Sequence, residues 1–165
     1  DTLSQRVVEV DGANLRQRYN TEGLFTWGFE AATTLHLTDA FRVELSAALQ
    51  DGQAERDASG ERPVLLQRPD AQLRAALDWQ ASSRLDLRAE VLHTSSAWDL
   101  DDDGELARLP DSTSVNLRGF LQLADWHGRD IQLMASIDNL ADELILPQLG
   151  LPAPGRTWRV GVRIN

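Results

Sequence analysis

The sequence predicts an all-β fold, in which about eight antiparallel strands follow one another as a meander and form a portion of an up-and-down transmembrane β-barrel. Three observations predict it. Apolar residues recur at every second position along most of the chain, which is the period of a strand with two different faces. The connections between these runs alternate between short and long. The polar positions of the runs carry many charges, whereas the apolar positions carry almost none.

The final stretch, WRVGVRI, shows the alternation clearly, because apolar residues from Trp158 to Ile164 alternate with arginine and glycine. Other runs share this pattern, the first of them more weakly. They occupy residues 3–10, 25–37, 41–49, 71–79, 85–91, 115–123 and 131–137. Tilted strands of about 9–11 residues cross a bilayer, so most of these runs are long enough to do so.

The connections predict which ends of the strands lie together. Short connections fall near residues 38–40, 81–83 and 125–129, and long ones near 11–22, 51–68, 97–112 and 139–155. Counting back from the C-terminus puts every short turn on the same side as the terminus and every long loop on the other. Membrane barrels have this asymmetry, with tight turns on one side and longer loops on the other.

The charged face predicts the orientation of the sheet. Charges in contact with lipid are costly, so these side chains are expected to face the lumen of a barrel. They balance in sign and comprise Glu30, Arg42, Glu44, Arg74, Asp78, Arg88, Glu90 and Arg118. A soluble antiparallel sandwich also alternates. The charged faces favour the membrane barrel, as do tryptophans near predicted strand ends, at Trp79, Trp98, Trp126 and Trp158.

Composition excludes several other functions. The formal net charge is −10 and the 16 basic residues, all arginine, are scattered, which argues against nucleic-acid binding. Cysteine is absent, so thiolate chemistry and disulfides are excluded. No run of about 18 apolar residues predicts a membrane-spanning helix. No arrangement of serine, histidine and acidic residues suggests a catalytic site, so we expect neither an enzyme nor a cofactor.

The loop sequence DLDDDGEL contains the one motif with metal-ligand spacing. Asp99, Asp101, Asp103 and Gly104 match the first half of a calcium loop, in which alternate carboxylates precede a sharp glycine turn. The match then fails, because Pro110 stands where the bidentate glutamate belongs. We expect a solvated acidic surface loop, and keep Asp99, Asp101 and Asp103 as candidate calcium ligands.

The C-terminal third of the chain resembles a known family. IDNLADELI, with Asn139 and Asp142, is followed by a loop and then by GRTW at 155–158, which is similar to the end of TonB-dependent receptors of the bacterial outer membrane. Upstream, Gly28 and Glu30 resemble the Gly-x-Glu strand of that family. The resemblance covers nearly the whole chain and keeps the family's order.

The resemblance implies that residues 1–165 are the C-terminal part of such a receptor barrel, with the plug domain absent. It implies active uptake of a scarce ligand, such as an iron–siderophore or cobalamin, across the outer membrane of a Gram-negative bacterium. The implied partners are outer-membrane lipid, a TonB-type energy-coupling protein acting through the missing plug, the barrel assembly machinery acting on the terminal strand, and a small ligand. No nucleic-acid partner is implied.

Two alternatives remain open at this stage. The chain could be a complete eight-stranded outer-membrane barrel with a structural or adhesive role, because eight strands can close. That barrel requires residues 3–10 to pair with residues 158–164. A soluble barrel of lipocalin type would instead point its charged faces to water. As a portion of a larger barrel, the chain is expected to form an open sheet whose spatial order follows the sequence.

Overall fold

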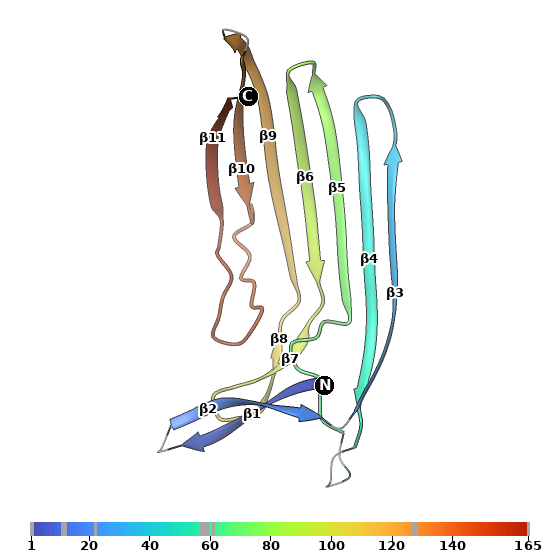
Figure 1. Cartoon of the computed structure of the whole chain (residues 1–165), viewed down its shortest axis with the longest axis vertical. Helices are drawn as coiled ribbons and strands as arrows, with labels where there is room; N and C mark the ends of the chain where they lie inside the picture. Colours follow the sequence, from blue (N-terminus) through green and yellow to red (C-terminus); the bar gives the residue numbers. More distant parts are fainter. Residues whose placement is uncertain are drawn as a thin grey trace.

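The computed structural model describes residues 2–10, 13–21, 23–56, 60, 62–126 and 129–164. A seven-stranded antiparallel sheet dominates it, in the order β11-β10-β9-β6-β5-β4-β3 (Figure 1). Its strands are β3 (Leu24–His36), β4 (Phe41–Ala54), β5 (Ala71–Ser82), β6 (Leu85–Thr94), β9 (Ser112–Trp126), β10 (Arg129–Asp138) and β11 (Thr157–Ile164). Each predicted run from residue 25 onward is therefore confirmed as a strand.

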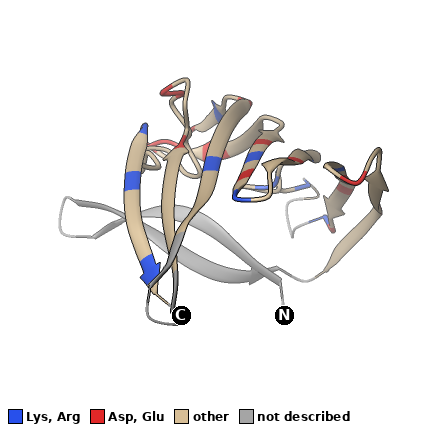
Figure 2. Ribbon diagram, turned by 90° about the horizontal axis from the view of Figure 1, so that it is seen from above, with Lys and Arg blue, Asp and Glu red and all other residues tan. Residues whose placement is uncertain are grey.

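The sheet is curved and open. Viewed along the strands it bends like part of a barrel wall (Figure 2). β3 and β11 form its two edges, and no ladder joins them within the described residues. The expectation of an open meander is confirmed for these seven strands.

The first part of the chain departs from the prediction. β1 (Thr2–Val10) pairs with β2 (Ala13–Thr21) in a separate two-stranded sheet. The prediction that residues 11–22 are a long connection is therefore wrong. β1 also fails to pair with β11, as the small closed barrel requires. Apolar alternation missed β2 because its sequence, ANLRQRYNT, is almost wholly polar, whereas strand pairing needs only backbone groups in register.

The long connection near residues 97–112 also contains strands. β7 (Ala97–Leu100) and β8 (Leu106–Leu109) form a short hairpin of their own. Two of the short connections, those near residues 38–40 and 81–83, are by contrast tight turns held by hydroxyl groups. The third predicted one, near residues 125–129, lies partly outside the described residues. Thr38 Oγ1 accepts hydrogen bonds from the backbone N–H groups of Ala40 and Phe41 at 3.2 and 3.1 Å. Ser82 Oγ likewise accepts one from the N–H of Arg84 at 3.2 Å.

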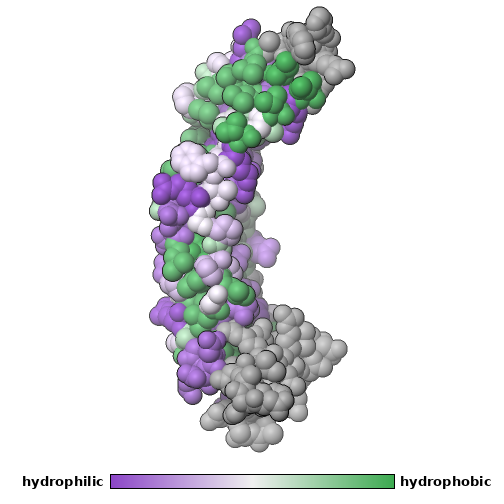
Figure 3. Space-filling model, turned by 90° about the vertical axis from the view of Figure 1, so that its left-hand side faces the viewer, coloured by the Kyte–Doolittle hydropathy of each residue, from purple (hydrophilic) through white to green (hydrophobic). Residues whose placement is uncertain are grey.

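One face of the sheet exposes its apolar side chains. Phe25, Trp27 and Phe29 of β3 are each more than 60% exposed, and Val160 of β11 is 78% exposed. Figure 3 shows the side of the molecule on which β11 lies, with hydrophobic side chains gathered toward its upper end. Near the short turns, Trp79 stacks on Phe41 with ring centroids 5.6 Å apart. Such a broad apolar face requires an apolar surrounding, which lipid supplies.

The sheet has almost no hydrophobic core of its own. Among the described side chains, the buried apolar ones are only Ala54, Ala76, Ala97 and Leu109. The described residues contain no helix of the length and hydropathy that crossing a bilayer demands. The sheet is therefore held together chiefly by its backbone ladders and by contacts across its faces.

A pair of arginine substitutions in β5 tests the assignment of the faces. Leu77 lies on the apolar face and is 38% exposed. We expect Leu77→Arg to destabilise the protein folded in a bilayer by about 2–4 kcal/mol, because it places a charge in lipid near the midplane.

Gln72→Arg is the matched control, since Gln72 is exposed on the opposite face of the same strand. It is a better control than Ala76, which is only 3% exposed. Urea titration of folding into lipid vesicles measures both variants. Equal losses for the two would show that the faces are assigned wrongly.

Candidate functional site: the charged face and the long loops

A network of ion pairs crosses the middle of the polar face. Glu44 lies 2.7 Å from Arg88, 3.5 Å from Arg74 and 3.6 Å from Arg42, measured between side-chain nitrogen and oxygen. Asp78 lies 3.0 Å from Arg42 and 2.6 Å from Arg88. The network thus links strands β4, β5 and β6.

The network continues toward β9. Arg74 Nε donates to Glu90 at 2.7 Å, and Asn116 Nδ2 donates to the same carboxylate at 3.3 Å. Of the side chains predicted to line the lumen, all but Glu30 and Arg118 belong to this network. Three arginines balance three carboxylates in it. These six charges therefore pair with one another on one face of an open sheet.

Strand register explains why the charges meet. Arg42 lies beside Asp78, which lies beside Arg88, in one row across the strands. The next row on this face places Glu44, Ala76 and Glu90 side by side. The methyl group of Ala76, 3% exposed, leaves room for arginines to reach both glutamates. The sequence showed this residue only as a small member of the polar face.

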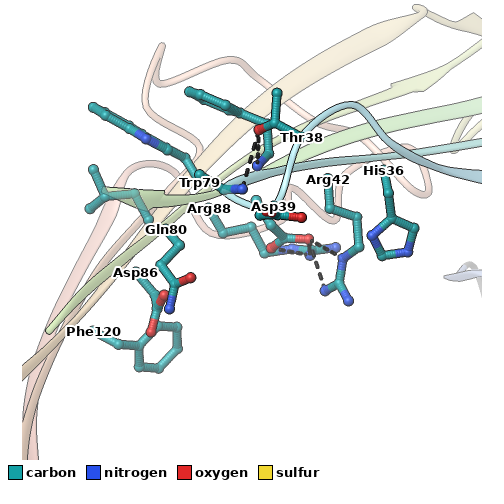
Figure 4. Close-up of a pocket in the computed structure, with 13 residues that line it drawn as sticks. His36, Thr38, Asp39, Arg42, Trp79, Gln80, Asp86, Arg88 and Phe120 are labelled. Atoms are coloured by element: carbon teal, nitrogen blue, oxygen red, sulfur yellow. Dashed lines mark hydrogen bonds and ion pairs between the residues drawn. The ribbon is translucent and has the colours of Figure 1, made fainter. Parts of the chain in front are cut away.

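A pocket opens beside the network at the short-turn end (Figure 4). Arg42 and Arg88 line it together with Asp39 of the β3–β4 turn, Asp86 of β6 and Phe120 of β9. The arginines are held by Asp78, so the pocket combines fixed charges with an aromatic side chain. This arrangement suits contact with another polar protein segment.

At the other end of the sheet, Asp99 ties the long loops together. Its side chain is fully buried, at 0% exposure. Asp99 Oδ1 accepts hydrogen bonds from Gln67 Nε2 at 3.2 Å and from the backbone N–H of Leu100 at 2.9 Å. Asp99 Oδ2 accepts one from the N–H of Leu149 at 2.8 Å. One carboxylate therefore joins the β4–β5 connection, β7 and the β10–β11 connection.

These contacts change the interpretation of the acidic loop. Asp99 is not the solvated side chain that the sequence suggested. Asp101 Oδ1 accepts hydrogen bonds from the N–H groups of Asp103 and Glu105, at 3.0 and 2.9 Å, and so holds the turn between β7 and β8. Within the described residues no three acidic or histidine side chains gather as a metal site. Calcium binding by Asp99, Asp101 and Asp103 stays a prediction.

The two halves of the C-terminal motif meet in space. Asp142 Oδ1 accepts a hydrogen bond from the N–H of Arg156 at 2.7 Å. A Cβ atom on Gly155 would lie 2.6 Å from the same oxygen, so a larger residue there would collide with it. Asn139, 4% exposed, closes its own turn through two hydrogen bonds to the backbone of Glu143, at 2.8 and 2.9 Å. The motif therefore sets the path of the chain into β11.

Comparison with known proteins gives a clear likeness in structure alone. Neither a family model nor a curated protein matches the sequence. BauA, the ferric preacinetobactin receptor from Acinetobacter baumannii, is 16% identical with a TM-score of 0.69, over 97% of this chain and 25% of BauA. The ferric enterobactin receptor PfeA from Pseudomonas aeruginosa is 23% identical with a TM-score of 0.65, over 93% of this chain and 24% of PfeA.

FpvA from P. aeruginosa, in a complex with a heterologous ferric pyoverdine, is 16% identical with a TM-score of 0.67, over 90% of this chain and 20% of FpvA. The chain thus spans about a fifth to a quarter of the receptors that it matches. BauA and PfeA are receptors for ferric preacinetobactin and ferric enterobactin, and FpvA binds pyoverdines. The predicted fold, an antiparallel portion of a β-barrel, is confirmed by this likeness.

Removing one arginine from the charged face tests the ion-pair network. Arg88 is 19% exposed and contacts both Glu44 and Asp78. We expect Arg88→Gln to lower the free energy of unfolding by about 1–3 kcal/mol, because two partly buried carboxylates lose a charged donor. Denaturant titration in detergent measures this change.

The control is Arg159→Gln, since Arg159 is 65% exposed and pairs with Asp138 at the edge of the sheet. An exposed pair contributes about 0–1 kcal/mol. If the two variants lose the same stability, the network does not stabilise the wall.

The second test concerns Asp99. Asparagine in its place cannot accept hydrogen bonds through both terminal atoms, so Asp99→Asn leaves either Leu149 or the Gln67 and Leu100 donors without an acceptor. We expect faster amide hydrogen exchange at residues 145–151, and a free energy of unfolding that is lower by about 1–3 kcal/mol. Asp103→Asn is the control, because the Asp103 side chain is exposed at the tip of the turn. Unchanged exchange in Asp99→Asn would contradict the tie between the loops.

Proposed function

We propose that this chain is the C-terminal part of the barrel of an outer-membrane receptor that takes up a scarce ligand, with a ferric siderophore as the leading candidate. The fold is that of a transport receptor of the outer membrane. The observation that carries the proposal is the opposition of the two faces. One side of an open, curved sheet exposes apolar side chains, and the other carries a balanced ion-pair network.

The open edges support a larger barrel. β3 and β11 each present one side without a strand partner among the described residues. Unpaired backbone N–H and C=O groups in hydrocarbon cost several kcal/mol each, so both edges require further strands. The receptors to which this chain is similar are several times longer than it, which leaves enough chain for such strands. The same edges disfavour the alternative of a complete eight-stranded barrel.

Each part of the chain then has a role. The charged face lines the lumen and contacts a plug domain carried elsewhere in the polypeptide. A TonB-type protein pulls on that plug to drive uptake. The barrel assembly machinery recognises β11, and outer-membrane lipid surrounds the apolar face. The long loops, held by Asp99, face the outside of the cell and meet the ligand first.

Uptake in the native bacterium tests the proposal. Cells that lack the gene are compared with wild-type cells under iron limitation, using a panel of siderophores loaded with radioactive iron. We expect the protein in the outer-membrane fraction and a loss of uptake for at least one siderophore. Removal of the TonB-type partner should cause the same loss.

Two outcomes would contradict this function. Release of the protein into buffer without detergent would favour the soluble barrel. Outer-membrane location with unchanged uptake across the panel, including cobalamin, would favour a structural or adhesive role.

A further inference from the structure

A cavity of about 380 Å³ lies at the long-loop end of the sheet, where β4, the β4–β5 connection and the β7–β8 hairpin meet. Arg62, Arg68 and Arg108 line it, together with Trp98 and the aspartates Asp51 and Asp70. We propose that this cavity binds the oxyanion groups of a water-soluble ligand. The inference rests on the proposed function, and it adds the charge class of the transported ligand.

Arg68 gives the strongest indication of a missing acceptor. Its Nε atom is buried and has no hydrogen-bond partner among the described residues. Its Nη2 atom reaches Gln50 Oε1 at 3.4 Å, near the limit for a hydrogen bond. A buried donor without an acceptor costs about 1–3 kcal/mol, and more when it is charged. An anion in the cavity would supply that acceptor.

The other two arginines are also without carboxylate partners in the described parts of the chain. Arg108 Nη2 donates to the hydroxyl of Ser96 at 2.7 Å, and Arg62 donates to the amide oxygen of Gln53. Both contacts are to neutral groups. The arginines of the wall differ, because Arg42, Arg74 and Arg88 all contact carboxylates.

The acidic groups of the cavity do not cancel its charge. Three arginines line it against two aspartates. Asp51 Oδ1 already accepts the backbone N–H of Gly52 at 2.7 Å. Counted over the described residues, the lining of the cavity is therefore net positive, in a chain whose formal net charge is −10. A guanidinium group presents a planar fork of donors that fits carboxylate, catecholate or phosphate oxygens.

The position of Arg68 selects a soluble ligand over a lipid headgroup. Arg68 also lines a neighbouring hollow whose lining comes mostly from the polar face, including Thr26, Gly28, Glu30 and Gln72, with Trp27 and Leu49 as the apolar-face members. That face is opposite the apolar face assigned to lipid. A ligand that reaches Arg68 therefore comes from the aqueous side of the wall.

The cavity is held in shape by the loops around it. The backbone N–H of Gln67 donates to the carbonyl oxygen of Trp98 at 2.7 Å, next to Arg68. Trp98 lies directly opposite Arg108 in the β7–β8 register and is 45% exposed, so it offers an aromatic surface beside the cations. A pre-formed site of this kind loses little entropy when it binds a ligand.

Two ferric chelates of opposite charge class test the proposal. The polypeptide is purified from outer membranes in detergent and titrated calorimetrically with a hexadentate ferric tris-catecholate, which is anionic. The second probe is a hexadentate ferric tris-hydroxamate, which is neutral and holds the same metal through oxygen atoms. We expect the anionic chelate to bind at least about tenfold more tightly, and Arg68→Gln or Arg108→Gln to weaken its binding by about tenfold or more.

Arg84→Gln is the matched control. It removes the same charge from an exposed residue in the β5–β6 turn, at the opposite end of the sheet. The Arg84→Gln variant should bind the anionic chelate as tightly as the unmodified protein does. Retained melting temperature in detergent shows that the Arg68 and Arg108 variants are folded.

The remaining outcomes separate this inference from the proposed function. Three outcomes would overturn the anion site: the two chelates bind equally tightly, the anionic chelate does not bind, or Arg84→Gln weakens its binding as much as Arg68→Gln does. The proposed uptake function would be unaffected by these outcomes, because uptake by cells tests it separately. Displacement of the anionic chelate by phosphatidylglycerol added to the micelles would assign the site to a lipid headgroup and overturn the soluble ligand.

Discussion

The segregation of charged and apolar side chains onto opposite faces of one sheet is the constraint on which the rest of this structure depends. Successive side chains of a strand point to opposite faces, so each strand carries both an apolar-face and a charged-face sequence. The register then decides which charges become neighbours. Arg42, Asp78 and Arg88 fall in one row, and Glu44 and Glu90 in the next. With Arg74, these charges pair with one another within the wall.

As a result, the two ends of the sheet differ in how their charged side chains are paired. Short turns such as that at Thr38 end the strands beside a pocket with paired charges, which suits lasting contact with protein. At the long-loop end, Asp99 joins three segments that are distant in sequence and so builds a fixed rim. Arginines beside this rim are not paired with carboxylates in the described structure. Ion pairs are thus concentrated in the wall, and arginines without carboxylate partners among the described residues line the cavity at the long-loop end.

Much of this could be predicted from the sequence, because a two-residue period determines both strand and face. The seven strands of the main sheet and the charged face follow from alternation alone. β2 could not be found in this way, since its polar sequence has no apolar period. The buried role of Asp99 was also beyond reach, because its partners at Gln67 and Leu149 lie in loops whose path depends on tertiary structure. The unpartnered Arg68 was missed for the same reason.

The orientation of the two faces in a bilayer is the central claim, and site-directed spin labelling tests it most directly. The chain contains no cysteine, so single cysteines at Gln72, Leu73, Ala75, Leu77 and Gln80 can each carry one label. Collision rates with oxygen, which concentrates in lipid, and with a water-soluble nickel complex are then measured in proteoliposomes. The account predicts high oxygen accessibility at positions 73, 75 and 77 and low accessibility at 72 and 80. Accessibility that does not alternate, or that alternates with the opposite phase, would contradict it.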